Sequence, residues 1–134
     1  MTNQNDFHLL SYYTLAHSGE NFIHQHIVDA FSAQNATEKT KLITIYFALV
    51  GLHLFIDRNF TGKQVQQFHI QLSNKTKTFD KILLPESRGQ ITISHVLNEE
   101  AGDKRDEMIK LWCESVWAAY TNEHKRIIDL VKLV

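Results

Sequence analysis

The sequence contains few of the residues that bend or cross-link a chain. Its 134 residues include one proline, five glycines and a single cysteine, Cys113. One cysteine excludes an internal disulfide and a zinc site made of several cysteines. The low content of proline and glycine favours long helices over a sheet with many turns.

The sequence also lacks an excess of charge and a long apolar run. It has 14 basic and 15 acidic residues, so charge gives no reason to expect nucleic acid or an anionic membrane as a partner. Its longest apolar segment, 42–56, is shorter than the roughly 20 residues that span a bilayer, and its first ten residues do not resemble a signal peptide. We therefore expect a cytoplasmic protein, and the length predicts a single domain over residues 1–134.

The segment 42–56 is the centre of the predicted fold. It is apolar on nearly all sides and too long for an ordinary strand, so it predicts a buried helix, which we expect Thr37 to open. His53 is its one strongly polar residue and shares a helical stripe with Tyr46 and Asp57. A buried polar group costs about 1–3 kcal/mol without a partner, so we expect another segment to face His53.

The pattern predicts an all-α fold, a helical bundle of four main helices plus a short fifth. An irregular arm or short hairpin is expected at about 79–95, where Pro85 and Gly89 mark a turn. Thr61 and Gln64 form a capping box at the start of one helix. The other predicted helices are Phe7–His17 after an Asp6 N-cap, Asn21–Gln34, Ser94–Glu100, and one helix of about 30 residues from Asp103 to the C-terminus.

Four polar residues on different helices are the candidates for a metal site. His26 and Asp29 are spaced i, i+3, and His53 and His69 lie on the apolar stripes of two successive helices. Imidazole and carboxylate groups suit zinc, nickel or iron, so His26, Asp29, His53 and His69 predict a divalent-metal or ligand site between helices. The alternative is that each of these side chains has only a structural partner.

Two further features concern other partners. Arg88 at the tip of the arm and Lys63 near the start of a helix could bind a small anion. The long last helix could extend past its own core and bury the excess apolar surface in a homodimer. The chain would then be an interaction module without enzymatic activity. No histidines are spaced i, i+4, and there is no phosphate-binding loop or nucleophile elbow, so nothing in the sequence identifies an enzyme.

Several phrases spread over the chain resemble an uncharacterised bacterial family of all-helical proteins, a domain of unknown function. The resemblance implies a helical fold over nearly the whole chain, and it implies no activity, cofactor or site residue. The phrases are Tyr13–His17, Phe22–His26 with Val28–Phe31 and Ala33–Gln34, Phe47–Leu52, Thr61–Gln66, Arg88–Gly89 with Ile91–Ile93, and Arg105–Asp106 with Trp112 and Ser115–Trp117.

Overall fold

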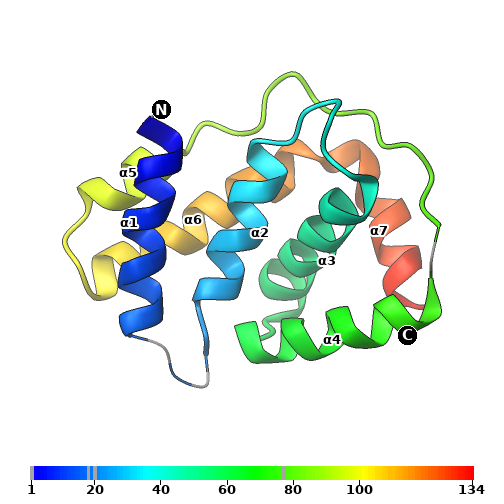
Figure 1. The fold of residues 1–134 in the computed structure, drawn as a ribbon, viewed down its shortest axis with the longest axis horizontal. Helices are drawn as coiled ribbons and strands as arrows, with labels where there is room; N and C mark the ends of the chain where they lie inside the picture. The colour runs from blue at the N-terminus through cyan, green and yellow to red at the C-terminus, as the bar shows by residue number, and fades with distance from the viewer. Residues whose placement is uncertain (1, 18, 20, 77) are drawn as a thin grey trace.

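Helix α3 (Leu42–Arg58) lies in the middle of the fold, and α2, α4, α6 and α7 pack against it (Figure 1). The structure is a computed structural model that describes residues 2–17, 19, 21–76 and 78–134. In these residues the fold consists of seven α-helices and one 3₁₀ turn, with no strand. The prediction of an all-α fold is confirmed.

The helices follow one another around α3. Helix α2 runs alongside α3, α4 lies across one end of the pair, and α6 and α7 cover the back in the view of Figure 1. None of the described helices is both long and apolar enough to cross a membrane. The bounds are α1 Thr2–Ala16, α2 His24–Gln34, α3 Leu42–Arg58, α4 Gly62–Lys75, α5 Ile93–Asn98, α6 Asp103–Ala119, the 3₁₀ turn η1 Thr121–Glu123 and α7 His124–Val131.

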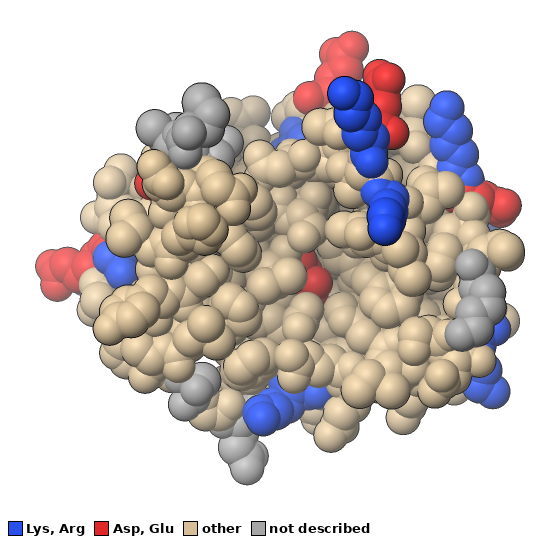
Figure 2. Space-filling view, in the orientation of Figure 1, with Lys and Arg blue, Asp and Glu red and all other residues tan. Residues whose placement is uncertain are grey.

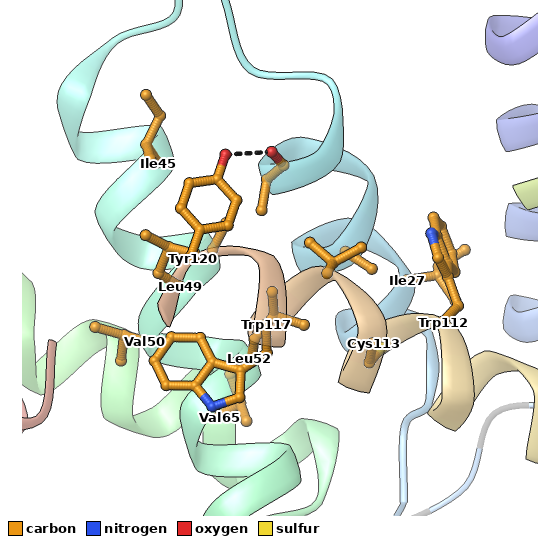
Figure 3. Packing of buried hydrophobic residues seen from close by; sticks show 14 of the residues in the cluster. Ile27, Ile45, Leu49, Val50, Leu52, Val65, Trp112, Cys113, Trp117 and Tyr120 are labelled. Atoms are coloured by element: carbon orange, nitrogen blue, oxygen red, sulfur yellow. Dashed lines mark hydrogen bonds between the residues drawn. The ribbon is translucent and has the colours of Figure 1, made fainter. Parts of the chain in front are cut away.

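Burial on all sides explains why α3 is apolar around its whole circumference. Its residues from Ala48 to Leu54 are all buried, and each fully buried leucine stabilises the fold by about 1.5–3 kcal/mol. Figure 3 shows Trp112, Cys113 and Trp117 of α6 directed among core residues of α2 and α3. The helix ends at Asn59, which adopts a left-handed conformation with φ 58°, as residues after a helix C-terminus often do.

The first turn of α4 has the predicted capping box. The Gln64 amide donates to the Thr61 hydroxyl, and the Gln64 side chain accepts from the Thr61 amide at 2.8 Å. At the next position, the Gly62 amide donates to the Asn21 carbonyl at 2.7 Å. A Cβ on Gly62 would lie 1.8 Å from the Phe22 carbonyl oxygen, so the loop before α2 fixes the start of α4.

The predicted starts of three helices were wrong. Helix α1 begins at Thr2, and Asp6 lies inside it instead of capping it. The prediction missed the first turn because its residues are polar and carry no apolar periodicity. Helix α2 begins at His24 instead of Asn21, since Phe22 has a left-handed φ of 41° that a helix cannot contain. Helix α3 begins at Leu42, and Thr37 instead closes a turn with Thr40.

The last predicted helix is in fact two. Helix α6 ends at Ala119, and η1 separates it from α7. The Trp117 carbonyl accepts from the His124 ring and from the Tyr120 amide, and the Thr121 hydroxyl donates to the Ala118 carbonyl. These hydrogen bonds replace the regular backbone hydrogen bonds of an α-helix. The turn leaves Ile127 and Val131 on the buried side, so the apolar pattern continues through the break and does not reveal it.

The segment between α4 and α5 is irregular, as predicted, and in its described residues it forms no hairpin. It crosses the fold as an extended strap (Figure 1). Tyr46 donates from its hydroxyl to the Asp80 carbonyl at 2.7 Å, and the Ile82 side chain is buried. The expected short helix runs from Ile93 to Asn98.

Candidate functional site

A hollow of about 270 Å³ opens between α2, α3 and α4. Near the centre of the face shown in Figure 2, the surface is hollowed, with uncharged residues around it and a small acidic area at its floor. Asp29 is the one Asp, Glu, Lys or Arg residue that lines the hollow. The lining residues are Gln25, Val28, Asp29 and Ser32 of α2, Ile43, Thr44, Phe47 and Ala48 of α3, and His69 of α4.

Asp29 is a buried carboxyl with an incomplete set of partners. Only 3% of the residue is exposed. Its Oδ1 accepts a hydrogen bond from the Gln25 side chain at 3.1 Å, whereas its Oδ2 has no hydrogen-bond partner. Burial raises the pKa of Asp29 well above its usual value, and the bond from Gln25 opposes this only in part. Burial therefore favours the neutral form of Asp29 more than in a free aspartate.

Gly51 makes room for the Asp29 carboxyl. An ideal Cβ at position 51 would lie 1.9 Å from Asp29 Oδ2 and 2.6 Å from its Cγ. Only a residue without a side chain fits there, so α3 has a glycine in the middle of an otherwise apolar helix. Close packing against Gly51 holds the Asp29 carboxyl in place at the side of the hollow.

His26 is the second buried polar residue of α2 that faces α3. Its ring stacks on Phe55, with ring centroids 3.6 Å apart and planes 7° apart. Burial lowers the pKa of His26 to about 4, so the imidazole is neutral near pH 7. Its Nδ1 and Asp29 Oδ2 are the two buried side-chain nitrogen or oxygen atoms without a hydrogen-bond partner in the described part of the chain.

His69 reaches the hollow from α4. Its Nε2 lies 2.8 Å from the Phe47 carbonyl oxygen, which can only accept, so Nε2 carries the proton and Nδ1 is left as an acceptor. The ring also stacks on Phe47 with centroids 4.9 Å apart. Burial lowers the pKa of His69, while the bond to Phe47 works against this.

His53 belongs to a different arrangement. Its Nδ1 donates to Asp57 Oδ2 at 2.8 Å, and the Trp117 indole nitrogen donates to the same oxygen at 3.0 Å. The hydrogen-bond partner of His53 therefore lies on its own helix, and the other segment that faces it is α6, through Trp117. On the other side of Trp117, the His124 ring stacks with centroids 3.7 Å apart.

The four predicted metal ligands are thus divided. Asp29 and His69 line one hollow, His26 stacks on Phe55 beside it, and His53 pairs with Asp57. Across the residues that the structure describes, no group of three or more histidine, cysteine, aspartate or glutamate side chains is placed to hold a metal ion. Cys113 is buried and its Sγ donates weakly to the His26 carbonyl. Burial raises the pKa of its thiol, so it has no thiolate character.

The two residues predicted to bind an anion are engaged within the fold. Arg88 donates from Nε to the Pro85 carbonyl and from Nη1 to the carbonyls of Gln34 and Ala36, the shortest two bonds being 2.7 Å. Arg88 therefore ties the strap to the end of α2. Lys63 lies over the Phe22 ring at 5.5 Å.

A second hollow of about 220 Å³, beside α1, has polar walls that are already paired. Its Tyr13 donates to Asp106 at 2.8 Å, and the His17 ring bonds to the Tyr13 carbonyl. Because no buried polar atom there lacks a partner, the hollow beside Asp29 is the stronger candidate among the described residues.

Sequence reasoning singled out Asp29 and His69 and missed what surrounds them. Gly51 was not identified, although a glycine inside an apolar helix signals close approach of another segment. Gln25 was also missed, and its place four residues before Asp29 is the signal that could have found it. Thr44 and Phe47 carry no local signal, because only the packing of α2 against α3 places them at the hollow.

Phrases that are far apart in the sequence meet in the fold. Tyr13 bonds to Asp106, and Gln34 accepts from the Trp112 indole at 2.9 Å. Gln34 also donates to two carbonyls of the strap, and Ser115 accepts from the amide of Gln90. These contacts give several polar residues of the phrases a structural role, whereas His26 Nδ1 and Asp29 Oδ2 have no hydrogen-bond partner.

Comparison with known proteins identifies the family but no activity. No curated protein and no solved structure gives a significant match to the chain. The family model described as "Family of unknown function (DUF5946)" matches residues 4–121. Since this match covers most of the sequence, the chain belongs to that family.

Proposed function

We propose that this protein binds a small molecule in the hollow between α2, α3 and α4, with Asp29 as its main polar contact. The observation that carries the proposal is the incompletely paired Asp29 carboxyl in the wall of that hollow. Buried polar groups in proteins are nearly always hydrogen-bonded, and buried acids with shifted pKa values cluster at functional sites. A ligand that reaches the carboxyl from the hollow would give it a second hydrogen-bond partner.

The shape of the hollow limits the ligand. Its volume of about 270 Å³ is slightly below that of most ligand pockets, which enclose about 300–1,000 Å³. Val28, Ile43 and Ala48 offer apolar wall, and Thr44 offers a hydroxyl at an exposed position. The site therefore suits a ligand of few atoms with one polar end.

A divalent transition metal is the second candidate, because Asp29 and His69 share the hollow. Two protein ligands would leave the remaining positions to water or to a bound molecule. Metal analysis of protein purified without a histidine tag tests this candidate. Bound zinc, nickel or iron that is lost in Asp29→Asn and His69→Ala would favour it, and unchanged melting on addition of these metals would count against it.

A blocked hollow gives the direct test of ligand binding. Thr44 is exposed at the rim, so Thr44→Trp should fill the opening without changing the core. Gln66→Trp, at an exposed position of α4 outside the lining, is the matched control. Amide NMR spectra should show fragments that shift the lining residues of the wild type and of Gln66→Trp, and not of Thr44→Trp. If no fragment shifts the lining residues, or if Thr44→Trp binds equally well, the proposal is wrong.

A homodimer without a ligand is the alternative from a different class of function. Ile109, Val116 and Ile127 of the predicted last helix are buried within the chain, so these residues are not open to a partner. The observation that favours a dimer is an apolar row on α1, where Leu9 is 63% and Tyr12 is 79% exposed. Sedimentation at micromolar concentration tests it: a dimer that Tyr12→Glu dissociates would favour the alternative, and a monomeric wild type would refute it.

A further inference from the structure

Three side chains of the hollow, those of Gln25, Asp29 and His69, have acceptor atoms left for a ligand, and the hydroxyls of Ser32 and Thr44 can also accept. His69 uses its only N–H on the Phe47 carbonyl, so Nδ1 is an acceptor. Gln25 donates one amide N–H to Asp29, and its side-chain oxygen remains as an acceptor. The Asp29 carboxyl can only accept when it is ionised. A complementary ligand group therefore has to bring several donors.

The charges around the hollow point the same way. The described residues that line it include no lysine or arginine, so none of them compensates an anionic ligand, which would also meet Asp29. A cationic group has the opposite effect, because a positive charge within about 4–6 Å of a carboxyl favours its ionised form. A buried carboxylate costs free energy when no opposite charge lies beside it, and so does a buried cation. When the two lie together, each compensates the charge of the other.

We propose that the ligand is a small primary amine, bound as an alkylammonium ion whose N–H groups donate to Asp29 and to the neighbouring acceptors. This inference rests on the proposed ligand-binding function of the hollow. The ammonium head supplies three donors and no acceptor. The alkyl part lies against Val28, Ile43 and Ala48, which form apolar wall. A bare metal ion would not use that wall, and the described residues offer no set of three metal ligands.

Binding of the ammonium ion is coupled to a proton. Asp29 has to lose its proton for the ion pair to form, so the complex releases up to one proton from protein and alkylammonium together. The other titratable groups around Asp29 are His26 on its own helix, His69 on α4 and Cys113 on α6, and burial favours the neutral form of each. Affinity should rise about tenfold per pH unit while Asp29 is protonated in the free protein, and should level off above its pKa.

Three probes of equal size separate the amine from other ligand chemistries. The full chain is titrated with butylamine, 1-butanol and butyrate, and binding is followed through the amide signals of the lining residues. Butylamine should bind, and the alcohol and the acid should bind at least about tenfold more weakly. Calorimetry in two buffers of different ionisation enthalpy should show that protons are released.

Variants test whether Asp29 is the reason. Asp29→Asn keeps the size of the side chain and should weaken butylamine binding about tenfold or more. Gln66→Trp, outside the lining, should bind as the wild type does. Equal binding of amine and alcohol by the wild type, or full binding by a folded Asp29→Asn protein, would overturn the inference.

The two proposals fail in different ways. If another fragment binds in the hollow and is excluded by Thr44→Trp, while butylamine does not bind, the amine is wrong and the ligand-binding function remains. If neither butylamine nor any fragment binds there, both are wrong. If butylamine binds and Asp29→Asn abolishes its binding, both are supported.

Discussion

Replacing Gly51 by alanine tests whether close helix packing holds the Asp29 carboxyl in place. The new Cβ would lie 1.9 Å from Asp29 Oδ2, whereas ordinary van der Waals contact begins at 3.4 Å. The carboxyl would have to move by about 1.5 Å, or α2 and α3 would have to separate. Forced overpacking costs about 1–3 kcal/mol. Alanine in a helix recovers roughly 0.5–1 kcal/mol relative to glycine.

Subtracting the helix gain from the overpacking cost, we expect Gly51→Ala to lower the free energy of unfolding by about 1 kcal/mol. Urea unfolding followed by circular dichroism measures this as a lower midpoint with an unchanged slope. Gly19→Ala is the control, since no atom lies within 4 Å of its ideal Cβ. Shortening Asp29 to alanine should make Gly51→Ala less costly, with a coupling of about 1 kcal/mol in the double-mutant cycle.

Two outcomes would refute this reasoning. Gly51→Ala could be as stable as the wild type, which would mean that Asp29 is not packed against α3. The effects of Gly51→Ala and Asp29→Ala could also be additive, which would place the cost of the new methyl group elsewhere. The amide spectrum of each variant shows whether it keeps the fold.

Three further substitutions test the buried polar groups. The pKa of His26 is about 4 in the folded chain and 6.5 in the reference state. Acidification from pH 6.5 to 4 should therefore lower the free energy of unfolding of the wild type by about 3 kcal/mol more than that of His26→Gln. Equal losses in urea titrations would contradict this. The pKa of Asp29 is raised, so its stabilising effect is present below about pH 4 and is lost as the pH rises through the folded pKa. Between about pH 4 and the folded pKa, the free energy of unfolding of Asp29→Asn should rise relative to the wild type by about 1.4 kcal/mol per pH unit. A difference that does not change with pH would contradict this. Arg88→Ala loses three bonds to backbone carbonyls and should destabilise the chain by about 1–3 kcal/mol and speed proteolysis of the strap; an unchanged cleavage rate would show that Arg88 does not hold the strap.

The elements with strong local signals could be predicted from the sequence. The apolar segment 42–56 gave the buried central helix, because length and hydrophobicity leave few alternatives. The capping box of Thr61 and Gln64 gave the start of α4. Helix starts that depend on other segments could not be predicted: Phe22 has its left-handed conformation beside Gly62 of α4, and no local pattern records that contact.

The candidate site could be predicted only in part, for the same reason. Periodicity places His53 and His69 on the inner side of their helices, and it does not say which group each of them meets. His69 bonds to the backbone of Phe47, and His53 bonds to Asp57 four residues further along its own helix. Whether inward-facing histidines share a site depends on side-chain geometry between helices, which the spacing of residues in one helix does not contain.

The central claim is that the fold holds Asp29 neutral beside a hollow until a cationic ligand ionises it. Carbon-13 NMR of the Asp29 carboxyl, titrated with and without saturating butylamine, tests this most directly. The account predicts a midpoint well above the usual 3.8 in the free protein and a lower midpoint in the complex. A midpoint near 3.8 in the free protein, or one that butylamine does not change, would contradict it.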